Sequence, residues 1–127
     1  VQVGELTADD MQMYEEVKDA INEKIKVGCT GCGYCMPCPA GVDIPGAFRC
    51  YNVRYTDSFF TGMREYMMCT TFRAERTNAS LCIKCGKCER HCPQGIPIRE
   101  KLGEVRKQME NPAYKVIAFF AKYLFKK

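Results

Sequence analysis

Several features that define other classes of protein are missing from these 127 residues. No apolar run reaches eighteen residues, and no apolar segment precedes a small-residue cleavage site, so we expect neither a membrane-spanning helix nor a secretory signal peptide. No segment alternates apolar and polar residues as a half-buried strand does, which predicts an all-α domain. A glycine-rich dinucleotide fingerprint is also missing. The ten cysteines are therefore the groups most suited to carry chemistry.

Eight of the ten cysteines fall into two runs, Cys29, Cys32, Cys35 and Cys38, then Cys82, Cys85, Cys88 and Cys92. The second run has the spacing C-x2-C-x2-C-x3-C-P, which is typical of bacterial 4Fe-4S ligation. Its first three thiolates wrap one face of a cubane, and its fourth ligates the other cluster in two-cluster ferredoxins. The first run is one residue shorter, so its spacing leaves open whether Cys38 stays on its own loop or crosses. Two such runs predict two 4Fe-4S clusters.

Other uses of cysteine fit the spacing less well. Structural zinc usually pairs two C-x2-C knuckles, and each run here has one thiolate more than a knuckle; a zinc-stapled structural or interaction domain is the alternative. A radical enzyme that uses S-adenosylmethionine needs an iron left open by three-cysteine ligation, whereas both runs offer a fourth cysteine. A disulfide framework is disfavoured because no export signal precedes it.

The composition indicates one globular, soluble domain in a reducing, cytoplasmic compartment, with 27% charged and 46% hydrophobic residues. The chain begins at Val1 rather than methionine, which suggests a processed chain, a subunit or a piece of something longer. Eight thiolates around two cubane cores would bring the formal charge of +4 to about zero. We therefore expect no nucleic-acid binding.

We expect a single domain over 1–127 with three parts. The first, over 1–28, is a helix capped by Thr7, with an apolar stripe that we expect to pack in the core: Met11, Tyr14, Val17, Ile21 and Ile25. The second is the two-cluster core over 29–110, with helices beginning near Pro45, Phe59 and Ile98. The apolar face of the last of these helices comprises Ile98, Leu102, Val105 and Met109.

The third part, over 111–127, is a basic amphipathic helix whose apolar residues include Val116, Ile117, Phe119, Phe120, Tyr123, Leu124 and Phe125. It is too short to span a membrane, although such a helix can lie on a membrane surface. We favour docking on its own domain or on a partner. The chain also repeats itself, because the segment 38–44 matches the segment 92–98 position for position. Each half is thus a cysteine loop, a Cys-Pro exit, a glycine turn and a helix.

With two predicted helices between the runs, the arrangement resembles the α-helical ferredoxin domains of succinate dehydrogenase, fumarate reductase and dihydropyrimidine dehydrogenase. A narrower resemblance appears when the runs are read with their neighbours. The segment from Cys29 to Pro45, then Phe48 and Tyr51-Asn52, then the segment from Cys82 to Ile98, resembles the C-terminal iron-sulfur extension of a group of aldo/keto reductase-family oxidoreductases. It covers roughly 6–109, and even the first helix resembles the segment that leaves the barrel in those proteins.

This resemblance implies an electron-transfer module that works with a redox partner protein or an aldo/keto reductase-like barrel, which would hold a flavin or nicotinamide centre. This chain has no room for the barrel or for its catalytic Asp, Tyr, Lys and His, so we expect no catalytic residue. The extension shares the short spacing of the first run, which implies crossed ligation. One cluster would take Cys29, Cys32, Cys35 and Cys92, and the other Cys82, Cys85, Cys88 and Cys38.

The remaining candidates have ordinary interpretations. Cys50 and Cys69 fall on predicted helices as small buried hydrophobes. His91, the only histidine, is expected to be a solvated loop residue. Lys84, Lys87 and Arg90 surround the second run, where they would favour a reduced cluster or attract an acidic partner; a solvated loop explains them equally well.

Overall fold

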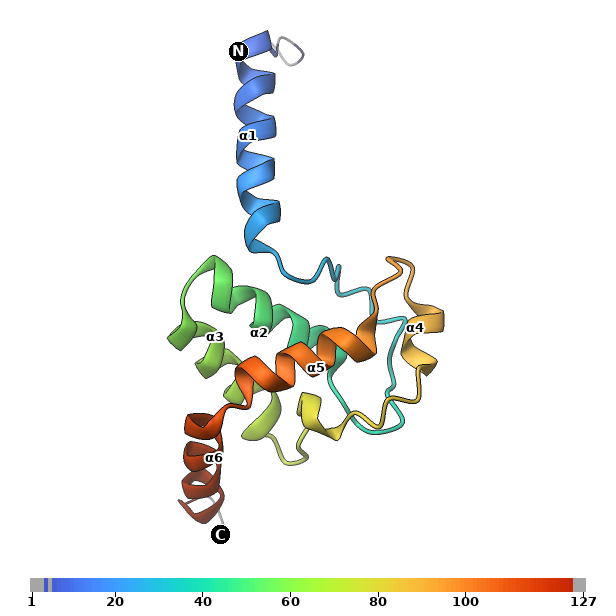
Figure 1. Ribbon diagram of the computed structural model, residues 1–127, viewed down its shortest axis with the longest axis vertical. Coiled ribbons are helices and arrows are strands. Elements are labelled where there is room, and N and C mark those ends of the chain that lie inside the picture. Colours follow the sequence, from blue (N-terminus) through green and yellow to red (C-terminus); the bar gives the residue numbers. More distant parts are fainter. Residues whose placement is uncertain (1–3, 5, 125–127) are drawn as a thin grey trace.

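Three helices, α2 (Ile44–Thr56), α3 (Phe59–Tyr66) and α5 (Ile98–Met109), form the centre of the computed structural model, which describes residues 4 and 6–124 (Figure 1). The prediction of an all-α domain is confirmed, because no described residue lies in a strand. The predicted apolar face of α5 is also confirmed, with Ile98, Leu102, Val105 and Met109 all buried. These side chains and the buried faces of α2 and α3 make up one core.

The helices α2 and α3 form a hairpin. Asp43 caps the start of α2 by accepting the N–H of Gly46, and Ser58 caps α3 by accepting the N–H of Thr61. The two helices approach most closely at Gly62, where a Cβ atom would lie 2.7 Å from the Cα of Arg54. Because real Cβ atoms do not come that close to backbone, this crossing requires glycine.

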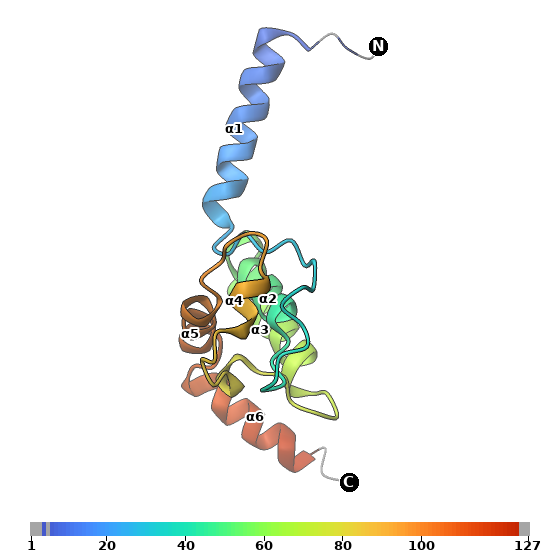
Figure 2. The ribbon, with the colours of Figure 1, turned by 90° about the vertical axis from the view of Figure 1, so that its right-hand side faces the viewer.

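The first helix, α1 (Ala8–Lys24), begins as predicted but does not pack as predicted. Thr7 and Asp10 form a capping box at its start. However, no residue of α1 is buried, and Tyr14 in its apolar stripe is 61% exposed. The helix projects from the body as a separate arm (Figures 1 and 2). The core-packing prediction for this stripe is therefore wrong, since periodicity tells which residues share a face but not what covers that face.

The last helix, α6 (Pro112–Leu124), docks on the body through one narrow face. Tyr114, Ala118 and Ala121 on this face are buried, whereas the other large apolar residues of the helix are exposed, with Phe119 at 67% and Tyr123 at 81%. The prediction that this helix docks on its own domain is therefore confirmed only for the face that carries Tyr114, Ala118 and Ala121. The remainder of this predicted helix, from Phe125 onward, lies outside the described residues. None of the helices in the described part of the chain has the length and apolar character needed to cross a membrane.

A π-helix, η1 (Met67–Thr71), continues from the end of α3, the helix predicted to begin near Phe59. Met67 is buried, but Met68 is 61% exposed. After it, the buried Asn78 amide donates to the hydroxyls of Thr70 at 3.1 Å and Thr71 at 3.2 Å. It also donates to the Tyr114 hydroxyl at 2.7 Å, so this amide ties η1 to α6.

A second buried group positions the start of the second cysteine run. The Tyr66 hydroxyl donates to the Glu110 carboxylate at 2.7 Å and accepts the N–H of Ala79 at 2.9 Å. The same carboxylate accepts the N–H of Ser80. These bonds fix the short 3₁₀ turn η2 (Ala79–Leu81), after which Cys82 begins the second run.

Candidate iron-sulfur sites

The sequence repeat becomes a pair of equivalent turns. The N–H of Gly41 donates to the carbonyl of Cys38 at 2.9 Å, and the N–H of Gly95 donates to that of Cys92 at 3.2 Å. Both glycines have positive φ, +78° and +64°, a conformation that favours glycine. Three residues later α2 and α5 begin at buried isoleucines. Each turn therefore holds the last cysteine of its run beside the start of a core helix.

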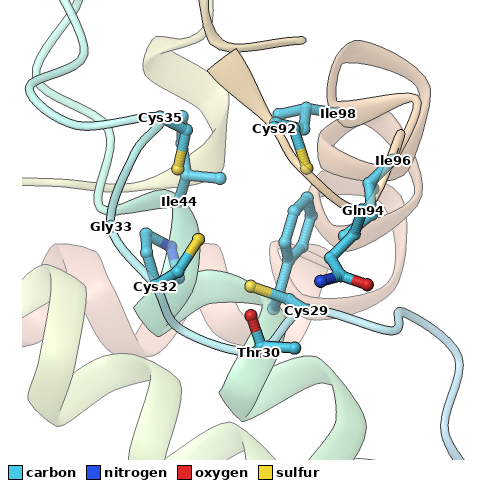
Figure 3. Close-up of a pocket in the computed structure, with 12 residues that line it drawn as sticks. Cys29, Thr30, Cys32, Gly33, Cys35, Ile44, Cys92, Gln94, Ile96 and Ile98 are labelled. Carbon is cyan, nitrogen blue, oxygen red and sulfur yellow. The ribbon is translucent and has the colours of Figure 1, made fainter.

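Four cysteines from both runs surround one pocket, in which the sulfurs of Cys29, Cys32, Cys35 and Cys92 face a common space (Figure 3). Most of the remaining lining is apolar, with Ile44, Pro45, Phe48, Ile96 and Ile98 among it. A cubane cluster needs four thiolates, and this pocket offers four thiols from two loops. The donor set therefore fits a 4Fe-4S cluster, with three ligands from the first run and one from the second.

The thiols are spread around this space rather than gathered at one point. Among the residues that the structure describes, no three His, Cys, Asp or Glu side chains come together as they would around a single metal ion. All ten cysteines are free thiols.

The segment that leads into the first run is clamped by one side chain. The Asn52 carboxamide oxygen accepts the N–H groups of Lys26 and Val27, both at 3.0 Å. The Asn52 amide nitrogen donates to the carbonyl of Val27 at 2.8 Å. Val27 is only 2% exposed, so these bonds satisfy backbone groups that water does not reach. Asn52 thereby positions Cys29, a role that the sequence did not reveal.

In the second run, Cys82 and Cys88 are half-buried and Cys85 is exposed. The Cys82 sulfur accepts the N–H of Lys84 at 3.4 Å, and Lys84 has a positive φ of +57°. Such N–H donors stabilise thiolate ligands and tune cluster potentials. Burial is the main cause that raises the pKa of Cys88, and a smaller contribution comes from Cys38. The last cysteine of the first run is thus close to the second run.

A candidate site residue that the sequence did not reveal, Arg99, lies beside this second run. Arg99, at the start of α5, donates to Glu89 through its backbone N–H at 2.9 Å and its Nε at 3.0 Å. Its guanidinium lies against Gly86 and within electrostatic range of Cys85 and Cys88. In the sequence, the one feature that could have pointed to Arg99 is its position directly after Ile98, the last residue of the repeated segment. The expected cations Lys84, Lys87 and Arg90 are exposed, as is His91. However, the loop prediction is wrong for Lys87, Arg90 and His91, which lie on the short helix α4 (Lys87–His91).

The two sites are neighbours. The pKa of the Cys35 thiol is raised to about 11, mainly by burial, with smaller contributions from the nearby sulfurs of Cys29, Cys88 and Cys32. Cys88 belongs to the second run, so the runs meet at these two cysteines. A shallow pocket lined by Tyr34, Cys35, Lys87, Cys88 and His91 marks the same junction. Metal binding there would have to displace the thiol protons.

Comparison with known proteins agrees with this geometry. A family model described as "4Fe-4S dicluster domain" matches residues 28–97, which is more than half of the chain. A probable glycolate oxidase iron-sulfur subunit of Bacillus subtilis (strain 168) is 29% identical over 96 residues. That match covers 75% of this chain but 21% of the relative, so the chain spans about a fifth of its length. No solved structure matches the chain.

The fold and the paired thiol sites define an α-helical, ferredoxin-like iron-sulfur protein. The chain belongs to the 4Fe-4S dicluster domain family. It holds two 4Fe-4S clusters, as the two cysteine runs predict. Membership supports electron transfer as its role and favours the iron-sulfur prediction over the zinc alternative.

Proposed function

We propose that this chain passes single electrons between its two clusters and a flavin or nicotinamide centre, as the iron-sulfur module of a larger oxidoreductase. The observation that carries the proposal is the meeting of the two runs at Cys35 and Cys88, which line one pocket. Each cluster supplies reversible one-electron chemistry when bound. The residues around it hold the ligands in place and exclude water on the core side.

We also propose the crossed partition of the ligands, in which Cys92 completes the first site and Cys38 the second. The pocket shared by Cys92 and the first run supports it, as does the proximity of Cys38 to Cys88. The test replaces Cys92 with serine and asks which cluster survives. Crossed ligation predicts that the survivor is the cluster whose potential responds to Arg99→Gln, because Arg99 lies beside the second run. A survivor insensitive to Arg99→Gln contradicts the partition.

For the parent enzyme, the resemblance of the motifs supports an aldo/keto reductase-like barrel that binds a nicotinamide cofactor, in the cytoplasm. A second candidate comes from the name of the relative, which supports a subunit of a glycolate-oxidising enzyme. In both cases the catalytic site lies outside this chain. The partner is a protein that carries the two-electron centre, and neither nucleic acid nor a membrane surface is needed.

One experiment tests the shared proposal and then separates the candidates. The chain is purified without oxygen and reduced photochemically while its EPR spectrum is recorded. Reversible reduction with magnetic coupling between the clusters is expected, and clusters that cannot be reversibly reduced would contradict electron transfer. The complex isolated from cells is then given reduced nicotinamide or glycolate. Bleaching by the first supports the barrel, and bleaching by glycolate supports the second candidate.

A further inference from the structure

The two cysteines outside the cluster runs lie together. Cys50, on α2, is completely buried, which confirms its prediction as a small hydrophobe. Cys69, in the π-helix η1, is only half-buried. The two sulfurs lie within interaction range of each other, and Cys69 packs against the core that contains Cys50. They therefore form a pair with one enclosed sulfur and one sulfur that solvent can reach.

The accessible member of the pair opens onto a pocket beside the first cluster site. Cys69, Arg49 and Arg73 line this pocket together with Cys29, the first predicted ligand of the cluster. The guanidinium of Arg49 lies near both sulfurs of the pair, and it is held by an ion pair with Glu65. The pocket thus gives Cys69 access, a cationic neighbour and proximity to a redox centre.

The backbone around Cys69 is held in place. The carbonyl of Cys69 accepts the Thr77 hydroxyl at 3.5 Å, and the carbonyl of Thr70 accepts the Thr77 N–H at 3.0 Å. These bonds brace the π-helix, a rare element that is frequent at functional sites. The adjacent Thr70 and Thr71 belong to the buried network of Asn78. Cys69 is therefore presented to Cys50 by a rigid segment.

We propose that Cys50 and Cys69 form a dithiol–disulfide couple that exchanges two electrons with the two clusters. In the reducing direction each reduced cluster gives up one electron, the S–S bond breaks, and each sulfur takes one proton from solvent. Two one-electron carriers thus match one two-electron acceptor. The disulfide forms again by exchange with a low-molecular-weight disulfide, which leaves as two thiols. The cluster step rests on the proposed electron-transfer function, whereas disulfide formation does not.

The first test measures the disulfide directly. The cluster-loaded chain is equilibrated without oxygen in buffers of reduced and oxidised glutathione, quenched in acid, alkylated and mapped by mass spectrometry. We expect a Cys50–Cys69 peptide that appears as the buffer becomes more oxidising and is lost in Cys69→Ser. Alkylation of both thiols in every buffer, or a disulfide to another cysteine, would overturn the couple.

The second test counts electrons. After treatment with oxidised glutathione and its removal, the wild type should take up about four electrons per chain, against about two in Cys69→Ser and in Cys50→Ala. Met68→Ser, at an exposed position of the same π-helix, should stay at about four. Equal uptake by the wild type and Cys69→Ser would overturn the inference while leaving the clusters intact. Uptake near zero in all chains would instead contradict the proposed function.

Discussion

Asn52 should matter more to this domain than its half-buried position suggests, because it holds the segment that leads to Cys29. In Asn52→Ala three hydrogen bonds disappear, each worth about 0.5–1.5 kcal/mol net. Two of them satisfy the N–H and carbonyl of the buried Val27, and unsatisfied buried groups cost about 1–3 kcal/mol each. We therefore expect the free energy of unfolding to fall by about 2–4 kcal/mol.

The assay is urea unfolding of the cluster-loaded protein without oxygen, followed by circular dichroism. The matched control is Asn22→Ala on the exposed arm α1, which should change the free energy of unfolding by no more than about 0.5 kcal/mol. Iron release to a chelator should also be faster in Asn52→Ala than in the control, since the loop of the first site is loosened. If the two variants unfold at the same urea concentration and lose iron equally fast, Asn52 does not clamp this loop.

Three further predictions follow from the site. Cys92→Ser should lower the iron content from about eight to about four per chain, and a variant that keeps about eight would show that Cys92 is not a ligand. Arg99→Gln should lower the reduction potential of the second cluster, because it removes a positive charge beside Cys85 and Cys88, whereas Arg106→Gln should not. Burial, followed by the Glu110 carboxylate, raises the pKa of Tyr66, so its stabilising contribution is complete below about pH 10 and is lost above it. The free energy of unfolding should then decline more steeply above pH 10 in the wild type than in Tyr66→Phe, and parallel declines would contradict this cause.

The sequence was most informative where a local rule acts alone. The capping residue Thr7, the start of α2 at Pro45 and the buried face of α5 follow from short-range chemistry, and the structure confirms them. The sequence repeat is also present in the structure, because Gly41 and Gly95 make the same turn. The spacing of the cysteines within each run is also a local feature, and the two 4Fe-4S clusters that it predicts agree with the family match.

The sequence was less informative about which residues come into contact when they lie far apart in the chain. The stripe that includes Tyr14 has a helical period whether or not anything covers it, and here nothing in the described structure buries it. Arg99 lies ten residues beyond Glu89, and only the turn at Gly95 brings the two together. The meeting of Cys50 with Cys69 likewise depends on the α2–α3 hairpin and the π-helix.

The most direct test of the account is the content of iron, zinc and acid-labile sulfide per chain, measured on protein purified without oxygen. Two 4Fe-4S clusters require about eight irons and about eight sulfides per chain. About two zincs without sulfide, as two four-thiolate sites would hold, would contradict the assignment and leave a metal-stapled interaction domain.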